Sequence, residues 1–286
     1  MKSLIDCYTL NNGVKIPCIG FGTWQAPEGA TAEQAVLEAL KAGYRHIDTA
    51  SAYENQVSIG KALKQSGLKR DEVFVTSKLF NPDHGYEKTI AAFKKTMKEL
   101  QVDYLDLYLI HWPNPIAYRN NWAESNAETW RAFEEFYQAG HIRALGVSNF
   151  HAHHLEALAK TAKIPPAVNQ IRLCPGDPKQ EVVTYSRARG LLIEAYSPFG
   201  GSGGGNLLND QVVASIAKKY GKSPAQVCIR WSLQKEYLPL PKSVTPGRIS
   251  SNTQVFDFEL DQGDMDLLTG LPGYPDPFPD PDHITW

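Results

Sequence analysis

The stretch HIDTASAYENQVSIGKAL (46–63) joins a short buried strand to an amphipathic helix. The segment that begins near Asn55 has the apolar spacing of a helix face, whereas HID is typical of a strand. Two polar side chains, Asp48 and Tyr53, stand at the exit of the strand, where a plain turn would be enough. The order of strand, polar exit and helix recurs along the chain, and this recurrence predicts the fold.

The sequence contains eight units of this kind. Their strands are short and largely apolar on both faces, as expected when helices cover a parallel sheet. The predicted strands are CIGFG (18–22), HIDTA (46–50), VFVTSK (73–78), LDLYLIH (105–111), ALGVSNF (144–150), AVNQI (167–171), LLIEAYSP (191–198) and YLPLPKS (237–243). The predicted helices span 31–43, 55–66, 86–100, 128–139, 151–160, 179–189, 211–220, 224–235 and 246–252.

Eight such units in one chain of 286 residues favour a closed (β/α)8 TIM barrel in a single domain, 1–286. The alternative is a doubly wound open sheet, which rarely needs eight units of such even size. Alternation around Asn-Gly in YTLNNGVKIP predicts a β-hairpin over 6–17, which we expect to cap the bottom of the barrel. The Pro-rich end predicts an irregular tail over 271–286 that lies above the pocket.

Composition narrows the class of protein. The 29 basic and 31 acidic residues nearly balance, with no basic block, which argues against nucleic acid as a partner. The four cysteines are scattered without a CxxC pair, which argues against a zinc site or a disulfide framework. No apolar run approaches about 18 residues, and the N-terminus lacks a secretion signal. We therefore expect a soluble, cytoplasmic protein with no membrane partner.

Four groups that can hold or move a proton follow three adjacent predicted strands. Asp48 ends the second strand, with Tyr53 just beyond it, while Lys78 ends the third and His111 the fourth. In a barrel, the C-terminal ends of the strands line the mouth of the active site. Each residue alone has an ordinary explanation, such as a cap, a solvated charge or a rim aromatic. Their convergence on one mouth predicts a catalytic site.

The chemistry of these groups suggests proton delivery to a carbonyl oxygen. A tyrosine has an ordinary pKa of about 10, and a nearby ammonium lowers it. We expect Lys78 to lower the pKa of Tyr53 in this way, with Asp48 holding Lys78 protonated. His111 can donate a hydrogen bond to the same oxygen. The carbonyl carbon then needs a hydride, which no side chain supplies, so a nicotinamide cofactor is implied.

Eight short motifs at successive strand exits, spread from about residue 6 to residue 255, resemble the aldo-keto reductases. They are GFGTWQ (20–25), HIDTASAYEN (46–55), TSK (76–78), IHWP (110–113), GVSNF (146–150), VNQ (168–170), AYSP (195–198) and LPKSVTPGRI (240–249). The resemblance is to bacterial-type members with a short C-terminal loop, similar to 2,5-diketo-gluconate reductases. It implies a monomeric barrel that reduces aldehydes and ketones with NADPH. In that family Tyr53 would be the general acid, Lys78 and Asp48 its tuning pair, and His111 the substrate orienter.

The resemblance also implies which residues hold the cofactor. Those near the nicotinamide and its ribose would be Gly22, Thr23, Asp48, Ser148, Asn149, Gln170 and Tyr196, the last stacked on the ring. Those around the pyrophosphate would be Ser197, Phe199 and the GGSGGG loop (200–205). Those at the 2′-phosphate and adenine would be Lys242, Ser243, Val244, Thr245, Arg248 and Asn252. Two cations on one phosphate favour NADPH over NADH.

Some positions depart from the family pattern. The usual Asn-Gln-Ile-Glu-x-His-Pro becomes NQIRLCP (169–175), with Arg172 and Cys174 as the unusual residues. Gln56 replaces a glutamate after the YEN motif, and Ser251 replaces a glutamate expected at the adenine. None of these positions belongs to the four catalytic candidates, and Ser251 lacks the carboxylate that the family pattern places at the adenine.

The substrate pocket is expected beside the catalytic candidates. Its walls would be Trp24 and Trp112, next to Tyr53 and His111, with Trp122 and the C-terminal tail as further candidates. Such walls suit apolar or flat carbonyl compounds, the small molecules that we expect as substrates.

Two alternatives remain open at this stage. Lys78 could be the nucleophile of a Schiff-base aldolase, a chemistry that barrels also host. The chain could instead be a binding or structural protein that keeps the cofactor site but turns over little. A metal site at HAHH (151–154) is not expected, because no acidic residue or cysteine lies nearby in the sequence.

Overall fold

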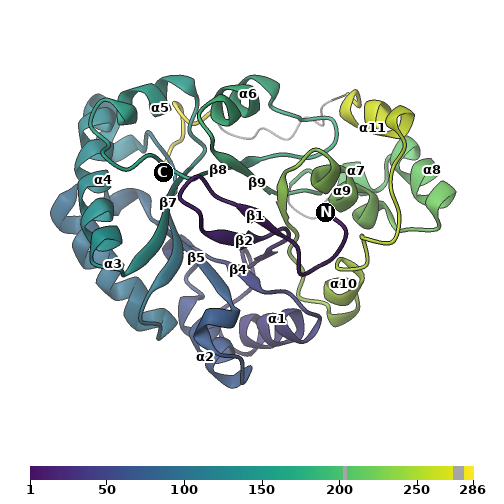
Figure 1. The fold of residues 1–286 in the computed structure, drawn as a ribbon, viewed down its shortest axis with the longest axis horizontal. Coiled ribbons are helices and arrows are strands. Elements are labelled where there is room, and N and C mark those ends of the chain that lie inside the picture. Colours follow the sequence, from purple (N-terminus) through teal and green to yellow (C-terminus); the bar gives the residue numbers. More distant parts are fainter. Residues whose placement is uncertain (202–204, 273–279) are drawn as a thin grey trace.

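The computed structural model describes residues 1–201, 205–272 and 280–286. Eight parallel strands form a barrel with helices around its outside (Figure 1). In sheet order from one edge to the other, the strands are β3 (Phe21–Gly22), β4 (His46–Asp48), β5 (Phe74–Leu79), β6 (Leu105–Ile110), β7 (Ile142–Ser148), β8 (Val168–Arg172), β9 (Leu192–Tyr196) and β10 (Leu238–Leu240). The predicted (β/α)8 barrel is confirmed.

The barrel closes at a seam between its first and last strands. The Gly20 N–H donates to the Pro239 carbonyl at 3.0 Å, and the Gly22 N–H donates to the Pro241 carbonyl at 3.1 Å. A methyl group on Gly20 would meet the Leu240 side chain at 2.5 Å and the His46 ring at 2.6 Å. A glycine is therefore needed for the close approach at this position.

The helices that surround the barrel follow the predicted strand–helix alternation. They are α1 (Ala30–Lys41), α2 (Gln56–Gln65), α3 (Tyr86–Leu100), α4 (Trp122–Gln138), α5 (Ala152–Ala159), α6 (Gln180–Ala188), α7 (Gly205–Leu208), α8 (Gln211–Tyr220), α9 (Pro224–Gln234), α10 (Pro246–Ser251) and α11 (Gln262–Thr269). Most begin and end within two residues of their predicted bounds.

Three helices differ from prediction, and one of them, the four-residue helix α7, was not predicted at all. Helix α4 begins at Trp122 and not at residue 128, because the intervening polar residues contain no helix breaker. Helix α11 was not predicted either, although its start carries a recognisable signal: the Asp261 side chain accepts a hydrogen bond from the Asp264 N–H at 2.9 Å. This is the geometry of an N-cap.

The N-terminal segment forms the predicted hairpin from β1 (Cys7–Thr9) and β2 (Lys15–Pro17), which pair antiparallel. The Asn11 side chain donates to the Pro166 carbonyl at 2.8 Å, and the Asn12 side chain donates to the Arg143 carbonyl at 2.9 Å. Both acceptors lie at the N-terminal ends of barrel strands. The hairpin therefore covers the bottom of the barrel, where it crosses the centre of the view in Figure 1.

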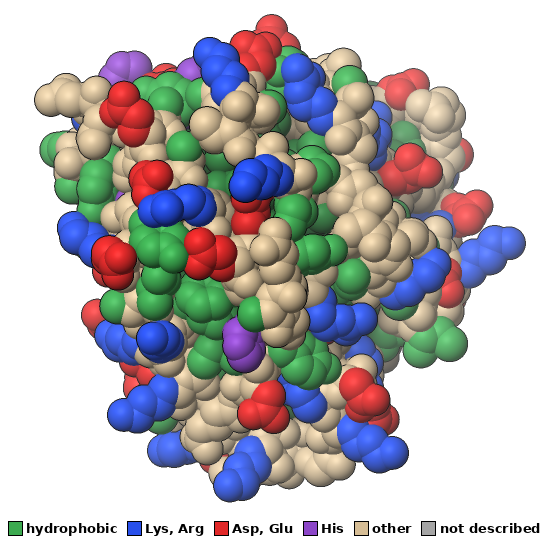
Figure 2. Space-filling model, turned by 60° about the vertical axis from the view of Figure 1, so that its left-hand side comes forward, with side chains coloured by type: hydrophobic (Ala, Val, Ile, Leu, Met, Phe, Trp, Pro, Cys, Tyr) green, Lys and Arg blue, Asp and Glu red, His purple; other side chains and the backbone are tan. Residues whose placement is uncertain are grey.

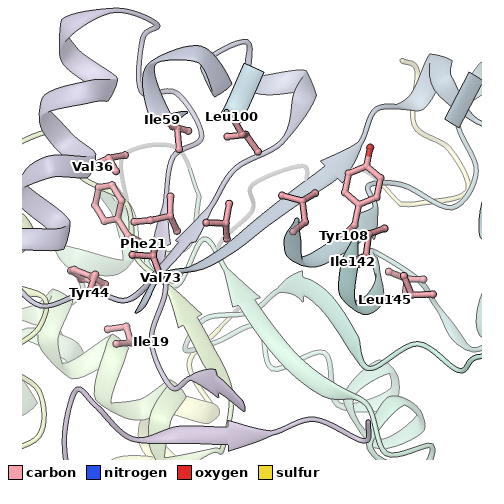
Figure 3. Packing of buried hydrophobic residues seen from close by; sticks show 14 of the residues in the cluster. Ile19, Phe21, Val36, Tyr44, Ile59, Val73, Leu100, Tyr108, Ile142 and Leu145 are labelled. Atoms are coloured by element: carbon pink, nitrogen blue, oxygen red, sulfur yellow. The ribbon is translucent and has the colours of Figure 1, made fainter. Parts of the chain in front are cut away.

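Apolar side chains fill the layer between the strands and the outer helices (Figure 3). The rings of Phe21 and Tyr44 lie edge to face with their centroids 5.5 Å apart, close to Val36 of α1. Burial of each large apolar side chain of this kind contributes about 1.5–3 kcal/mol. This layer fixes the strands, and the strands in turn fix the side chains at their C-terminal ends.

The outer surface carries charges of both signs. Figure 2 shows basic and acidic side chains interspersed over one face of the molecule, with hydrophobic atoms between them. Among the helices of the described ranges, not one combines the length and the apolar character that crossing a bilayer requires.

Candidate active site

Three consecutive strands bring the four predicted catalytic side chains together. Asp48 ends β4, Lys78 lies near the end of β5, and His111 directly follows β6. Tyr53 ends a short 3-10 helix, Ser51–Tyr53, that leads from β4 toward α2. Because the C-terminal ends of parallel strands meet at one rim, these groups converge although they are far apart in the sequence.

Lys78 is completely buried and uses all three of its N–H groups. Its Nζ donates to Asp48 Oδ1 at 2.7 Å, to the Thr49 carbonyl at 2.9 Å and to Tyr53 Oη at 3.3 Å. Burial alone would lower the pKa of Lys78, but the Asp48 carboxylate and the Tyr53 oxygen raise it above its ordinary value. Lys78 is therefore held as an ammonium ion. A Schiff-base nucleophile needs an accessible, uncharged amine, so this geometry does not support the aldolase alternative.

The pKa of Tyr53 differs in direction from the sequence-based prediction. Burial raises it, the Lys78 ammonium lowers it and the Asp48 carboxylate raises it, so that the net pKa lies above the ordinary value of tyrosine. The prediction of a lowered pKa was wrong because Asp48 neutralises much of the Lys78 charge, and because burial opposes formation of a phenolate. Tyr53 consequently carries its proton at neutral pH.

His111 faces Tyr53 across the site. The two rings lie edge to face with centroids 5.7 Å apart, and the His111 ring also stacks on Trp112 at 6.5 Å. Burial, the Lys78 charge and His84 hold the pKa of His111 well below its ordinary value. A neutral imidazole has one N–H to donate, as the predicted orienting role requires.

These groups stand at a cavity of about 1000 Å³. Its lining includes the predicted cofactor residues Gly22, Asp48, Ser148, Asn149, Gln170, Tyr196, Ser197, Phe199, Lys242, Ser243, Val244, Thr245, Arg248 and Asn252. Thr23 is the exception: it does not line the cavity, and its hydroxyl donates to the Asp48 carbonyl at 2.9 Å. Thr23 therefore holds the Asp48 backbone behind the cavity wall, whereas the sequence predicted a direct contact of Thr23 with the cofactor.

The residues predicted to bind the nicotinamide end form one hydrogen-bonded network. The Ser148 hydroxyl donates to the Gln170 carbonyl at 2.8 Å, and the Tyr196 hydroxyl donates to Asn149 Oδ1 at 2.7 Å. Asn149 has a φ of 62°, in the left-handed region that non-glycine residues rarely adopt. Backbone strain of this kind is concentrated at functional sites.

The residues predicted to bind the phosphates lie on other elements. Lys242 follows β10 and its Nζ donates to the Gln25 carbonyl at 3.0 Å, while Arg248 is exposed in α10. Ser223 and Pro224 at the start of α9 also line the cavity, although the sequence did not predict them there. In the GGSGGG loop, residues 202–204 lie outside the described residues.

The predicted substrate-pocket residues Trp24, Tyr53, His111 and Trp112 all line the cavity. Trp122 was wrongly placed in the pocket, because it begins α4 and packs its ring on His154 at 4.9 Å.

The C-terminal residue contributes to the same wall. Trp286 lines the cavity and meets the Trp112 ring edge to face at 5.7 Å, and the Asn81 side chain donates to its carbonyl at 3.2 Å. Residues 273–279, including Tyr274 and Phe278 of the predicted tail, lie outside the described residues.

The tail also supplies an acidic partner to HAHH, which the sequence alone did not place there. Asp282 lies 3.0 Å from His153 Nε2 and 2.9 Å from His154 Nε2, and it accepts a hydrogen bond from Asn114 at 3.0 Å. His154 Nδ1 accepts from the His151 N–H at 3.1 Å, which leaves the ring proton on Nε2, facing Asp282. These hydrogen bonds hold the tail against α5. A metal bound at His154 Nε2 would need the ring proton on Nδ1, which is the other tautomer.

For the carbonyl substrate and the NADPH cofactor that the sequence predicts, Asp282→Ala should release the tail and raise the KM for the substrate about tenfold, with little change in cofactor affinity. A hydrogen bond to a charged group contributes about 1.5–3 kcal/mol, and the variant removes several of them. Steady-state kinetics and a cofactor titration measure both quantities. Asp103→Ala removes an exposed carboxylate just before β6, away from the tail, and is the control; an unchanged KM in Asp282→Ala would contradict the prediction.

Several residues that build the site were not predicted. Asn55 is fully buried and donates to the Thr23 carbonyl at 2.9 Å and to the Ala26 carbonyl at 3.1 Å, which ties two loops of the rim together. Gln56, a departure from the family pattern, accepts a hydrogen bond from Ser77 at 2.6 Å beside Lys78. Glu194 lies inside the barrel on β9. The only signal for Glu194 was a charged residue in the middle of an apolar strand.

Comparison with known proteins agrees with this geometry. A family model described as the aldo/keto reductase family matches residues 18–271. A glyoxal reductase of Bacillus subtilis is 45% identical over 282 residues, which cover 99% of this chain and 98% of the relative.

Solved structures give the same result. An aldo-keto reductase from a Medee basin deep-sea metagenome library has a TM-score of 0.92 at 41% identity, and the match covers 98% of this chain and 100% of that one. An aldo-keto reductase of Bombyx mori in complex with NADP has a TM-score of 0.84 at 32% identity, covering 94% and 92%. The family match over most of the chain and these near full-length similarities lead to one conclusion: the chain belongs to the aldo/keto reductase family.

Proposed function

We propose that this protein uses NADPH to reduce aldehydes and ketones to alcohols, with Tyr53 as the general acid. Members of the family reduce carbonyl compounds, and one structural neighbour holds NADP. The observation that carries the proposal is the single Lys78 ammonium, bonded at the same time to Asp48 and to Tyr53 beside the cavity. Residues 1–286 would work as one domain, as a monomer in the cytoplasm.

The residues around the cavity suit the cofactor. Side-chain amides and hydroxyls gather at the end near Tyr53, where a carboxamide needs both donors and acceptors. Lys242 and Arg248 supply two cations for a phosphate elsewhere in the same cavity. A volume of about 1000 Å³ leaves room for a large ligand and a small substrate together.

The four catalytic candidates then divide the work. The phenol of Tyr53 donates its proton to the carbonyl oxygen, and the Lys78 ammonium stabilises the phenolate that this leaves behind. Asp48 keeps Lys78 charged and oriented. The neutral His111 donates a hydrogen bond to the carbonyl oxygen, which fixes it near the phenol. NADPH, when bound, supplies the hydride that the carbonyl carbon accepts.

A steady-state screen tests the function. Purified protein is mixed with NADPH or NADH and a panel of aromatic aldehydes, dicarbonyl compounds and ketones, and cofactor oxidation is followed by absorbance. We expect turnover that requires the carbonyl substrate and is faster with NADPH at low cofactor concentration. Tight NADPH binding without turnover on any carbonyl compound would favour the binding-protein alternative.

Cofactor preference gives a sharper prediction. The double variant Lys242→Ala/Arg248→Ala should weaken NADPH binding roughly 10–100-fold and leave NADH binding nearly unchanged, because only NADPH carries the 2′-phosphate that the two cations would contact. Fluorescence titration with each cofactor measures the two affinities. Arg189→Ala removes an exposed arginine that does not line the cavity and serves as the control. Equal weakening of both cofactors would contradict the assigned phosphate contacts.

A further inference from the structure

Glu194 is a carboxyl group inside the barrel that the proposed chemistry does not use. It lies on β9, has no exposed surface and does not line the cavity. Its Oε2 accepts a hydrogen bond from Gln170 Nε2 at 2.8 Å. Its Oε1 has no hydrogen-bond partner among the described residues and lies 3.8 Å from His46 Nε2. A buried carboxylate left this incompletely bonded would be costly, so its protonation state needs an explanation.

The amide of Gln170 connects Glu194 to the candidate catalytic group. The same Nε2 donates to Asp48 Oδ2 at 2.8 Å, so its two N–H groups are shared between two carboxyl groups. Asp48 is paired with Lys78 and can only accept hydrogen bonds, which requires the amide nitrogen to face it. Glu194 takes the second N–H. The amide oxygen of Gln170 makes no hydrogen bond within the described residues, and Gln170 lines the cavity.

The charges around Glu194 do not balance if it is ionised. Two carboxyl groups, Asp48 and Glu194, approach one amide, while the nearby Lys78 ammonium is bonded directly to Asp48. His46 offers no second cation, because burial and the Lys78 charge lower its pKa to about 3. Burial and the Asp48 charge raise the pKa of Glu194 to about 8. Two neighbouring carboxyl groups in a dry site commonly share one negative charge in this way.

We propose that Glu194 is a positioning residue that works as a neutral carboxylic acid: together with Asp48 it fixes the Gln170 amide so that its oxygen is presented to the nicotinamide carboxamide. This inference rests on the proposed NADP(H) site. Glu194 itself touches neither cofactor nor substrate and acts through Gln170.

Two consequences follow. Without an acceptor at position 194, one N–H of Gln170 is left buried and unpaired, and the amide can turn to satisfy it at the expense of the cofactor contact. Ionisation of Glu194 has a different effect, because it adds a negative charge near the bound nicotinamide. That charge favours the positively charged ring of NADP⁺ over the neutral ring of NADPH.

The first experiment measures cofactor affinity by quenching of tryptophan fluorescence in the wild type, Glu194→Gln and Glu194→Met. Glutamine keeps an acceptor for the Gln170 N–H and should bind NADP⁺ at pH 7 within about twofold of the wild type. Methionine keeps the size but not the acceptor and should bind about tenfold more weakly, a difference of about 1.4 kcal/mol. A methionine variant that is folded and binds like the wild type overturns the positioning role. If the wild type bound neither NADP⁺ nor NADPH, the proposed function itself would fail.

The second experiment follows the ratio of the NADP⁺ and NADPH dissociation constants from pH 7 to pH 9.5. In the wild type the ratio should fall about tenfold as Glu194 ionises, whereas in Glu194→Gln it should stay nearly constant. Lys242 also lines the cavity and burial lowers its pKa, but it is the same in both proteins, so the difference between them isolates Glu194. Identical pH profiles in the two proteins overturn the neutral-acid assignment.

Thermal unfolding provides a readout that needs no ligand. The pKa of Glu194 is raised on folding from 4.5 to about 8, so the folded protein binds the proton more tightly than the unfolded chain. Its contribution to stability is fully present below pH 4.5 and is lost as the pH rises through about 8. The Tm of Glu194→Gln minus that of the wild type should therefore grow between pH 5 and pH 8.5. A difference that is flat over this range counts against the proposal, even if Glu194→Met fails to fold.

Discussion

Tyr53→Phe should lower kcat for carbonyl reduction by about 10²–10⁴-fold while NADPH binds almost as well as before. The variant removes one oxygen, which is the proton donor in the proposed reaction and accepts a hydrogen bond from Lys78 at 3.3 Å. The ring, its edge-to-face contact with His111 and the shape of the cavity remain. The loss should therefore appear in kcat and not in the affinity for the cofactor.

A matched control is available within the same barrel. Tyr44 is fully buried, and its hydroxyl has no hydrogen-bond partner among the described residues, so Tyr44→Phe removes a phenolic oxygen outside the site. It should leave kcat within about twofold of the wild type, since no proposed step uses it. If Tyr53→Phe kept most of its kcat, the general acid would have to be another group.

Lys78→Met is the second change with a large expected effect, and it should act on two quantities. Without the ammonium, the phenolate left by proton transfer loses its stabilising charge, so kcat should fall by at least about 10²-fold. Asp48 would also be left as a buried and unpaired carboxylate, which costs about 3–5 kcal/mol of folding stability. NADPH binding should remain largely intact, because Lys78 does not line the cavity.

A double variant separates these two effects. Asp48→Asn/Lys78→Met removes the unpaired charge and should recover most of the lost stability, measured by urea unfolding, without recovering kcat. Recovery of kcat in the double variant would show that Lys78 matters only for folding. A single variant with nearly normal kcat would remove Lys78 from the proposed mechanism.

The barrel and the convergence of the four catalytic candidates were predictable from sequence because both depend on the order of elements. Once Asp48, Lys78 and His111 each follow a strand of a parallel barrel, the topology alone brings them to one rim. The details of the intervening helices do not matter for this. The prediction that α4 begins at residue 128, when it begins at Trp122, therefore left the four catalytic candidates in place and misplaced only Trp122.

The features that could not be predicted from sequence depend on how deeply a side chain is buried and on hydrogen bonds between distant parts of the chain. The direction of the Tyr53 pKa shift follows from the balance between burial and two opposing charges, and burial is a property of the folded chain. The bond between Gln170 and Asp48 joins residues 122 positions apart, and the one between His154 and Asp282 joins residues 128 apart. Neither pair has a spacing that a local pattern can detect.

The seam between β3 and β10 joins two of the shortest strands of the barrel. Strand β3 spans two residues and β10 three, whereas β6 and β7 pair over most of their length. Local opening of a fold begins where few hydrogen bonds must break, so transient fluctuations should start at this junction. Gly22 and Lys242 flank it and both line the cavity. A ligand that contacted both residues would hold the two sides of the junction together. Part of its binding free energy would then offset the cost of restricting this motion.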